Sequence, residues 1–109
     1  MTVDVPKPIA SYFAAKNERD ADAATRCFAS DATVLDEGKT VAGATAIREW
    51  AMETMRKYQY RIEPLRVSRQ RDKTIVTSRV TGNFPGSPVD LRFVFALKED
   101  KIASLQVLA

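Results

Sequence analysis

The sequence contains no histidine and only one cysteine, and both shortages restrict the chemistry that it can support. Without histidine, a serine or cysteine triad has no imidazole base, and a zinc site loses its usual ligands. The single Cys27 cannot form a disulfide within the chain, which is typical of a reducing compartment. We interpret it as a small buried residue rather than a nucleophile. The sequence therefore predicts no metal site and no cofactor.

Glycine is scarce, and no long apolar run is present. Four glycines do not form a phosphate-cradling loop, and no segment is long enough to span a bilayer. The stretch from Met1 to Lys7 lacks the charged and apolar regions of a secretion signal. From these features we expect a cytoplasmic protein with no membrane contact.

The chain has 109 residues, of which 45% are hydrophobic and 28% charged, as expected for one globular domain spanning residues 1–109. The net charge is +3, and basic residues gather around one turn: Arg61, Arg66, Arg69, Arg71 and Lys73. Acidic residues interrupt this group, and no aromatic platform accompanies it. The pattern favours a strand edge protected by charge over nucleic acid as a partner, with an acidic partner as a minor alternative.

Helical periodicity dominates the first half of the chain. One helix is expected to begin near Pro6 or Pro8, and a second, short helix should follow Asp20 as its cap. Residues 32–36 have the composition of a short strand. The strongest helical pattern covers residues 44–57, where apolar side chains recur on one face: Ile47, Trp50, Ala51, Thr54, Met55 and Tyr58.

The second half alternates with a period of two, which predicts four long strands joined by hairpins. The apolar side chains change from even to odd positions at Glu63-Pro64, so we expect a bulge there. Three helices followed by such strands predict an α+β fold in which three N-terminal helices pack against a cone-shaped, curved antiparallel sheet. The wide mouth of such a cone is a natural pocket for a small apolar molecule.

The strand expected at residues 89–98 has a second face that is only partly polar, because Val94 and Ala96 lie on it. If the helices cover one face of the sheet, a second subunit would cover the other. We therefore expect a homodimer that forms through the sheet.

Two motifs lie between Ala10 and Trp50: Phe28-Ala29-Ser30-Asp31-Ala32-Thr33-Val34, and Gly43 followed by Ala46-Ile47-Arg48-Glu49-Trp50. They resemble the nuclear transport factor 2-like superfamily, particularly its SnoaL-like and ketosteroid-isomerase-like branches. The resemblance implies a cystatin-like fold with a cone-shaped pocket, commonly in a dimer. It leaves the activity open, because this fold carries isomerases, cyclases, transport factors and binding modules.

The same resemblance suggests two catalytic residues. Asp36 lies at the position of the isomerase general base, and Tyr12 lies at that of a tyrosine that donates to a developing oxyanion. A carboxylate that faces an apolar cavity has a raised pKa and accepts protons better near neutrality. The simpler interpretations are a solvated turn residue for Asp36 and a core aromatic residue for Tyr12.

One position departs from the isomerase pattern. Val94 stands where the isomerases carry a second, acidic hydrogen-bond donor, although another register would bring Asp90 or Arg92 to the pocket. Besides Asp36 and Tyr12, we expect five residues to line the pocket: Trp50, Met55, Phe84, Val94 and Arg92. Two functions stay open: cofactor-free proton transfer next to a carbonyl of an apolar ligand, by an isomerase or lyase, and a non-catalytic ligand-binding or dimerising module.

Overall fold

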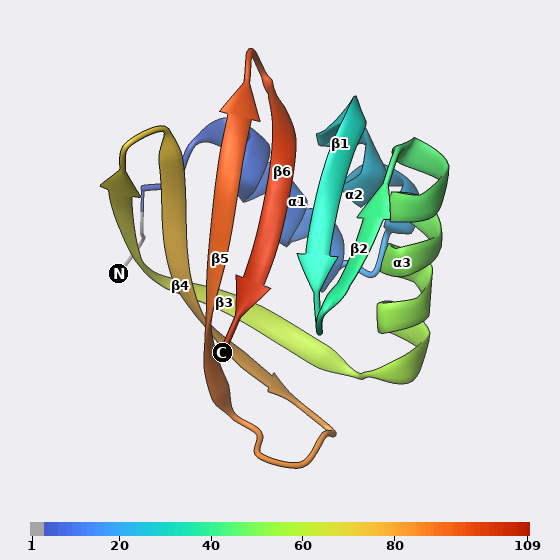
Figure 1. Ribbon diagram of the computed structural model, residues 1–109. Helices are drawn as coiled ribbons and strands as arrows, with labels where there is room; N and C mark the ends of the chain where they lie inside the picture. Colours follow the sequence, from blue (N-terminus) through green and yellow to red (C-terminus); the bar gives the residue numbers. More distant parts are fainter. Residues whose placement is uncertain (1–3) are drawn as a thin grey trace.

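The computed structural model describes residues 4–109, in which three helices lie on the concave side of one six-stranded sheet (Figure 1). The elements are α1 (Lys7–Asn17), α2 (Ala21–Arg26), β1 (Phe28–Asp36), β2 (Lys39–Ala42), α3 (Ala44–Lys57), β3 (Tyr60–Gln70), β4 (Lys73–Gly82), β5 (Val89–Lys98) and β6 (Lys101–Leu108). The strand order across the sheet is β2-β1-β6-β5-β4-β3. The predicted α+β fold of three helices on a curved sheet is confirmed.

The sheet differs from the prediction in one pairing, because it is mixed rather than wholly antiparallel. The strands β1 and β6 run parallel, whereas every other neighbouring pair is antiparallel. This pairing joins strands that are far apart in the chain, with α3 and four strands between them. The strand β1 also begins at Phe28, earlier than expected, and its register with β6 shifts between Phe28 and Thr33.

Local sequence explains how α1 is placed over the sheet. Proline occupies the first turn of α1, where its missing N–H costs nothing. At the other end, the Asn17 side chain accepts a hydrogen bond from the Ile62 N–H (2.7 Å) and donates one to the Ile62 carbonyl (2.8 Å). The end of α1 is thereby attached to β3. Asp20 caps α2 as predicted, since its carboxylate accepts from the Ala23 N–H at 3.0 Å.

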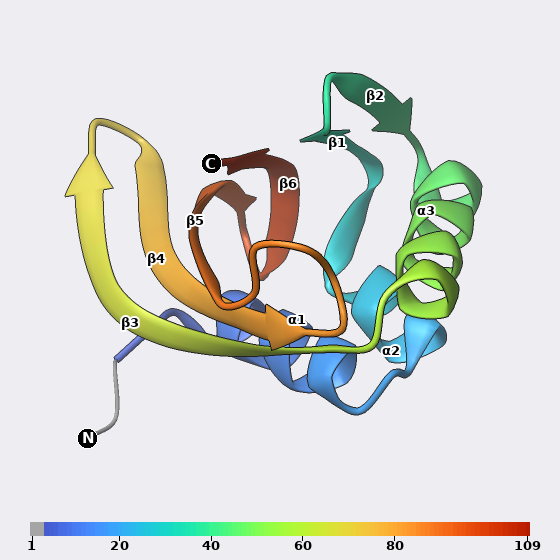
Figure 2. The same ribbon diagram turned by 90° about the horizontal axis from the view of Figure 1, so that it is seen from below.

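Curvature of the sheet comes mainly from its long strands. Figure 2 shows β3 and β4 bending together in a long arc, with the start of β3 close to α3. The register between these strands shifts between Pro64 and Arg66, which confirms the predicted bulge. The strand β3 forms one edge of the sheet, and Arg61, Arg66 and Arg69 are exposed on it. Three of the five residues of the basic cluster therefore lie on an edge strand, where charge discourages unwanted strand pairing.

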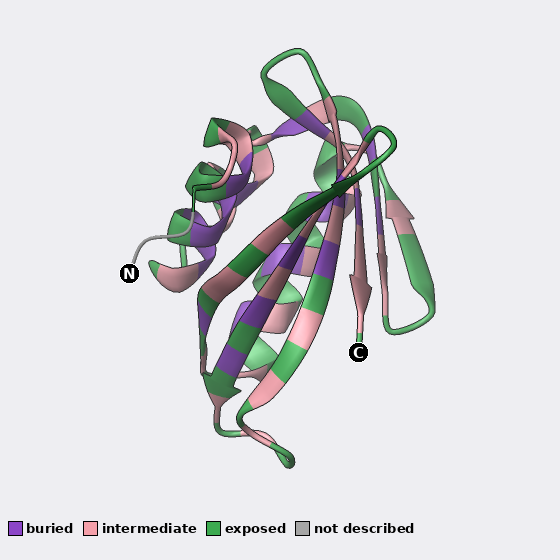
Figure 3. Cartoon of the chain, turned by 90° about the vertical axis from the view of Figure 1, so that its left-hand side faces the viewer, coloured by how far each residue is buried: buried purple, intermediate pink, exposed green. Residues whose placement is uncertain are grey.

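The core fills the space between α1 and the centre of the sheet. Buried and more exposed residues alternate along the strands (Figure 3), as they must when one face is covered. The Phe13 ring packs edge-on against Phe93 and Phe95, with centroids 5.2 and 5.8 Å apart. Aromatic side chains fill this part of the concave side. Within residues 4–109, no helix is long and apolar enough to cross a membrane.

Candidate functional site

A cavity of about 480 Å³ opens between α1, α3 and the concave face of the sheet. Its walls are mainly apolar or aromatic: Tyr12, Trp50, Tyr58, Tyr60, Ile62, Val80, Phe84, Pro85, Gly86, Val89, Leu91, Phe93 and Val107. Among the described residues, four other side chains line it, namely Lys16, Asp36, Glu37 and Thr54. This size and this mixture of many apolar and few polar groups are typical of sites for small organic ligands.

Asp36 ends β1 and reaches the cavity from that strand. The carboxylate is half-buried, and its Oδ2 accepts a hydrogen bond from the Trp50 Nε1 at 3.1 Å. Burial raises the pKa of Asp36, and the neighbouring Glu37 adds to the rise, while the Trp50 hydrogen bond and the Lys16 charge act in the opposite direction. The net result is a carboxylate that accepts a proton more readily than an exposed one.

Tyr12 lines the same cavity from α1 and is only 1% exposed. Its ring packs edge-on against Phe28 and Phe95, at centroid distances of 5.4 and 6.0 Å. Burial is the largest cause of a Tyr12 pKa well above the ordinary value, with a smaller contribution from Asp36. The phenol therefore keeps its proton at neutral pH and can donate a hydrogen bond to a ligand oxygen.

Lys16 also lines this cavity, although sequence reasoning did not select it. It is 3% exposed, its Nζ donates to the Thr54 Oγ1 at 3.0 Å, and it lies 4.4 Å from the centroid of the Trp50 ring. Burial lowers the pKa of Lys16 to about 7, against the opposing attraction of Asp36. A signal for it existed, because Ile9, Tyr12 and Lys16 share one face of α1 at helical spacing.

Trp50 and Phe84 line the cavity as expected, but the other three predicted lining residues do not. Met55 is buried elsewhere, beside the turn between α1 and α2, because five positions along a helix turn a side chain away from Trp50.

Val94 and Arg92 lie on the opposite face of the sheet from the cavity, since alternate residues of β5 point in opposite directions. Leu91 and Phe93 take the inner positions on this strand. Arg92 is exposed, and its guanidinium donates to the Ala109 carbonyl at 3.3 Å. The position aligned with the second acidic donor therefore does not reach the cavity from this strand.

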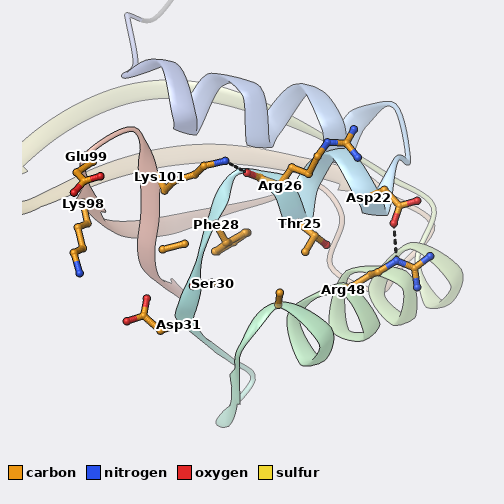
Figure 4. A pocket seen from close by; sticks show the side chains of 12 residues that line it. Asp22, Thr25, Arg26, Phe28, Ser30, Asp31, Arg48, Lys98, Glu99 and Lys101 are labelled. Carbon is orange, nitrogen blue, oxygen red and sulfur yellow. Dashed lines mark hydrogen bonds and ion pairs between the residues drawn. The ribbon is translucent and has the colours of Figure 1, made fainter.

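A second, more polar hollow of about 800 Å³ lies beside α2, β1 and the turn between β5 and β6 (Figure 4). Two contacts within the protein engage some of its charged groups. Arg48 pairs with Asp22 at 2.6 Å, and the Lys101 Nζ donates to the Arg26 carbonyl at 2.6 Å. We assign the candidate site to the smaller, apolar cavity, because burial shifts the pKa values of several of its titratable groups, which face a shared apolar space.

The chain matches the family model for the SnoaL-like domain over residues 9–105. One similar solved structure, from Sinorhizobium meliloti, is provisionally described as a polyketide cyclase. It is 39% identical over 95% of both chains, with a TM-score of 0.90. An epoxide hydrolase/cyclase-like enzyme in pyran ring formation in polyether salinomycin is 29% identical, with a TM-score of 0.79, and the match covers 94% of this chain and 87% of that one.

A protein of ketosteroid isomerase-like fold from Catenulispora acidiphila, solved in complex with trimethylamine, is similar in fold alone. It has 20% identity and a TM-score of 0.85, and the match covers 97% of this chain and 87% of that one. No curated protein matches the chain by sequence.

Proposed function

Because the chain belongs to the SnoaL-like domain family, we propose that its cavity binds a small, largely apolar carbonyl compound and moves a proton on the carbon next to the carbonyl. One observation carries this proposal: Asp36 and Tyr12 line a single cavity whose other walls are mostly apolar. A proton acceptor and a hydrogen-bond donor that face one apolar space are the two groups that enolisation requires.

The roles follow from the protonation state of each group. The Asp36 carboxylate takes the proton from carbon, the negative charge moves to the carbonyl oxygen, and the Tyr12 hydroxyl donates a hydrogen bond to that oxygen. Asp36 then returns the proton to the same or another carbon. The hydrogen bond from the Trp50 Nε1 fixes the Oδ2 of this carboxylate.

The relatives support a carbonyl compound as the ligand. The name of the Sinorhizobium meliloti protein refers to polyketides, which carry repeated carbonyl groups. Their ring closure by carbon–carbon bond formation begins with loss of a proton next to a carbonyl, the same elementary step. The apolar walls favour a ligand with few charged groups, since burial of an unpaired charge is costly.

Asp36→Asn tests the proposal. The probe is 3-cyclohexenone, whose double bond moves into conjugation when a proton is transferred, so that turnover is followed by ultraviolet absorbance. Loss of the base should reduce the rate by roughly 10²–10⁴-fold. Asp31→Asn is the matched control, because Asp31 lies exposed on the same strand and outside the cavity.

Equal rates for Asp36→Asn and the wild-type protein would contradict the role of Asp36. If the wild-type protein bound the probe without turning it over, the non-catalytic binding module would be the better description.

A further inference from the structure

We propose that Lys16 is a second reactive group of this cavity and that its amine forms a Schiff base with the carbonyl of a bound aldehyde or ketone. The inference rests on the proposed function, because it needs a carbonyl ligand in the same cavity. It adds a covalent step that proton abstraction by Asp36 does not itself require.

The position of Lys16 is the first argument. It lies one helical turn after Tyr12 on α1, so the two side chains reach the cavity side by side. The Nζ lies 4.4 Å from the Trp50 ring centroid and 5.5 Å from that of Tyr60. Aromatic rings thus replace most of the water that surrounds an ordinary lysine, and a ligand in the cavity meets the amine directly.

Hydrogen bonding leaves the amine free to attack. The Thr54 hydroxyl donates to the Ala51 carbonyl at 3.0 Å, so it accepts the hydrogen bond from the Lys16 Nζ. A neutral amine in this position therefore uses one N–H for Thr54 and keeps its lone pair available. The same hydrogen bond limits the rotation of the side chain, which favours one direction of approach.

Several groups set the protonation of this amine. Arg19, in the turn after α1, disfavours the ammonium form, and Asp36 on β1 favours it. The phenols of Tyr12 and Tyr60 stay neutral because burial raises their pKa values. The burial of Lys16 outweighs the other effects, and its pKa falls to about 7. About half of the molecules then carry a neutral amine at neutral pH, whereas an exposed lysine is almost entirely ammonium.

The bond changes balance without any further reactant. The Lys16 lone pair attacks the carbonyl carbon, and one proton moves from the nitrogen to the oxygen to give a neutral carbinolamine. A proton delivered by the Asp36 carboxyl then lets the hydroxyl leave as water, while the nitrogen lone pair forms the C=N bond. The product is a protonated imine. Because a protonated imine withdraws electrons more strongly than a carbonyl, the neighbouring C–H becomes more acidic, which makes abstraction by Asp36 easier.

Reductive trapping tests this step. The protein is incubated at pH 7 with cyclohexanone and sodium cyanoborohydride, which reduces the imine and fixes a cyclohexyl group on nitrogen. Peptide mapping by mass spectrometry should find Lys16 labelled about tenfold or more faster than any exposed lysine. The labelling rate of Lys16 should level off above a pH of about 7, while that of exposed lysines keeps rising with pH.

Lys16→Arg should abolish the fast labelling, since a guanidinium stays protonated. Lys39→Arg is the matched control, because Lys39 is exposed on β2, and this variant should keep the fast labelling at Lys16. Circular dichroism establishes that the Lys16 variant is folded. Labelling of Lys16 no faster than that of exposed lysines would overturn the inference, even if Asp36-dependent isomerisation were present and the proposed function stood. Fast labelling at Lys16 without isomerisation would support the inference and contradict the proposed proton transfer.

Discussion

At the scale of single residues, the cavity holds a carboxyl group and an amine whose pKa values move towards each other. Burial raises the pKa of Asp36 and lowers that of Lys16 to about 7, although each group attracts the charge of the other. Burial outweighs this attraction because both side chains lose water on folding. Groups that exchange protons near neutrality are the ones that acid–base chemistry needs.

The lowered pKa of Lys16 predicts that stability depends on pH. Between about 7 and its ordinary value of 10.5, the unfolded chain binds a proton that the folded chain releases, so the free energy of unfolding rises with pH. From pH 7 to pH 9 we expect a rise of roughly 2 kcal/mol. Tyr12 and Tyr60, whose pKa values are raised, act in the opposite direction only as the pH approaches the ordinary tyrosine value of 10.0.

Urea unfolding at pH 7, 8 and 9 measures this dependence. Lys16→Met should remove the rise, because methionine carries no titrating group in the cavity, and it should be more stable than the wild-type protein at pH 7. Lys39→Met, at an exposed position on β2, should keep the rise. Parallel stability curves for Lys16→Met and the wild-type protein would show that Lys16 is not buried in this way.

Sequence reasoning at this scale identified the residues that a motif or a clear period marked. Asp36 and Tyr12 followed from their positions in the family that the sequence resembles, and Trp50 from its helical stripe, and all three line the cavity. Lys16 was missed because a lysine on an apolar stripe is usually interpreted as a residue whose charged end reaches water. The prediction that Val94 lines the pocket was wrong, because an alternating pattern distinguishes the two faces of a strand but does not show which of them faces the cavity.

At the scale of elements, α1 and β1 supply the proposed reactive groups, and long-range contacts hold them in place. The two Asn17–Ile62 hydrogen bonds attach α1 to β3, and β1 is fixed by parallel pairing with β6. Helix bounds could be predicted well, because periodicity and caps are local signals; the third helix spans residues 44–57 as expected.

Other features of the sheet could not be predicted from local signals. The strand β2 was not recognised because Lys39, Thr40 and Ala42 are exposed and show no apolar pattern. The strands β1 and β6 pair in parallel although they are far apart in the sequence. No turn joins them directly, so no local signal predicts this pairing.

At the scale of the whole molecule, the sheet face opposite the helices carries a row of half-buried residues across four strands. Cross-strand pairing places Leu35, Gln106, Val94 and Ile75 side by side in that order. None of them is fully buried, and three of the four are apolar. A second copy of the chain could cover this surface, as the sequence-based expectation of a homodimer requires.

Light scattering coupled to size exclusion tests this prediction. We expect the mass of a dimer, and Ile75→Glu should shift it towards the monomer, because a carboxylate placed in the interface would be buried without a partner. Met52→Glu is the control: Met52 is 40% exposed on α3, away from this sheet face, and its replacement should leave the mass unchanged. A monomer mass that does not change with concentration would contradict the dimer.

Entry of a ligand into the cavity is observed most directly through Trp50, the single tryptophan of the sequence, which lines it. Titration with cyclohexanone should quench its fluorescence with saturation. Val107→Phe, which fills the cavity, should remove this saturation, whereas Val94→Phe, on the opposite sheet face, should keep it. Quenching that rises linearly without saturation, and equally in all three proteins, would show that small ketones do not bind there.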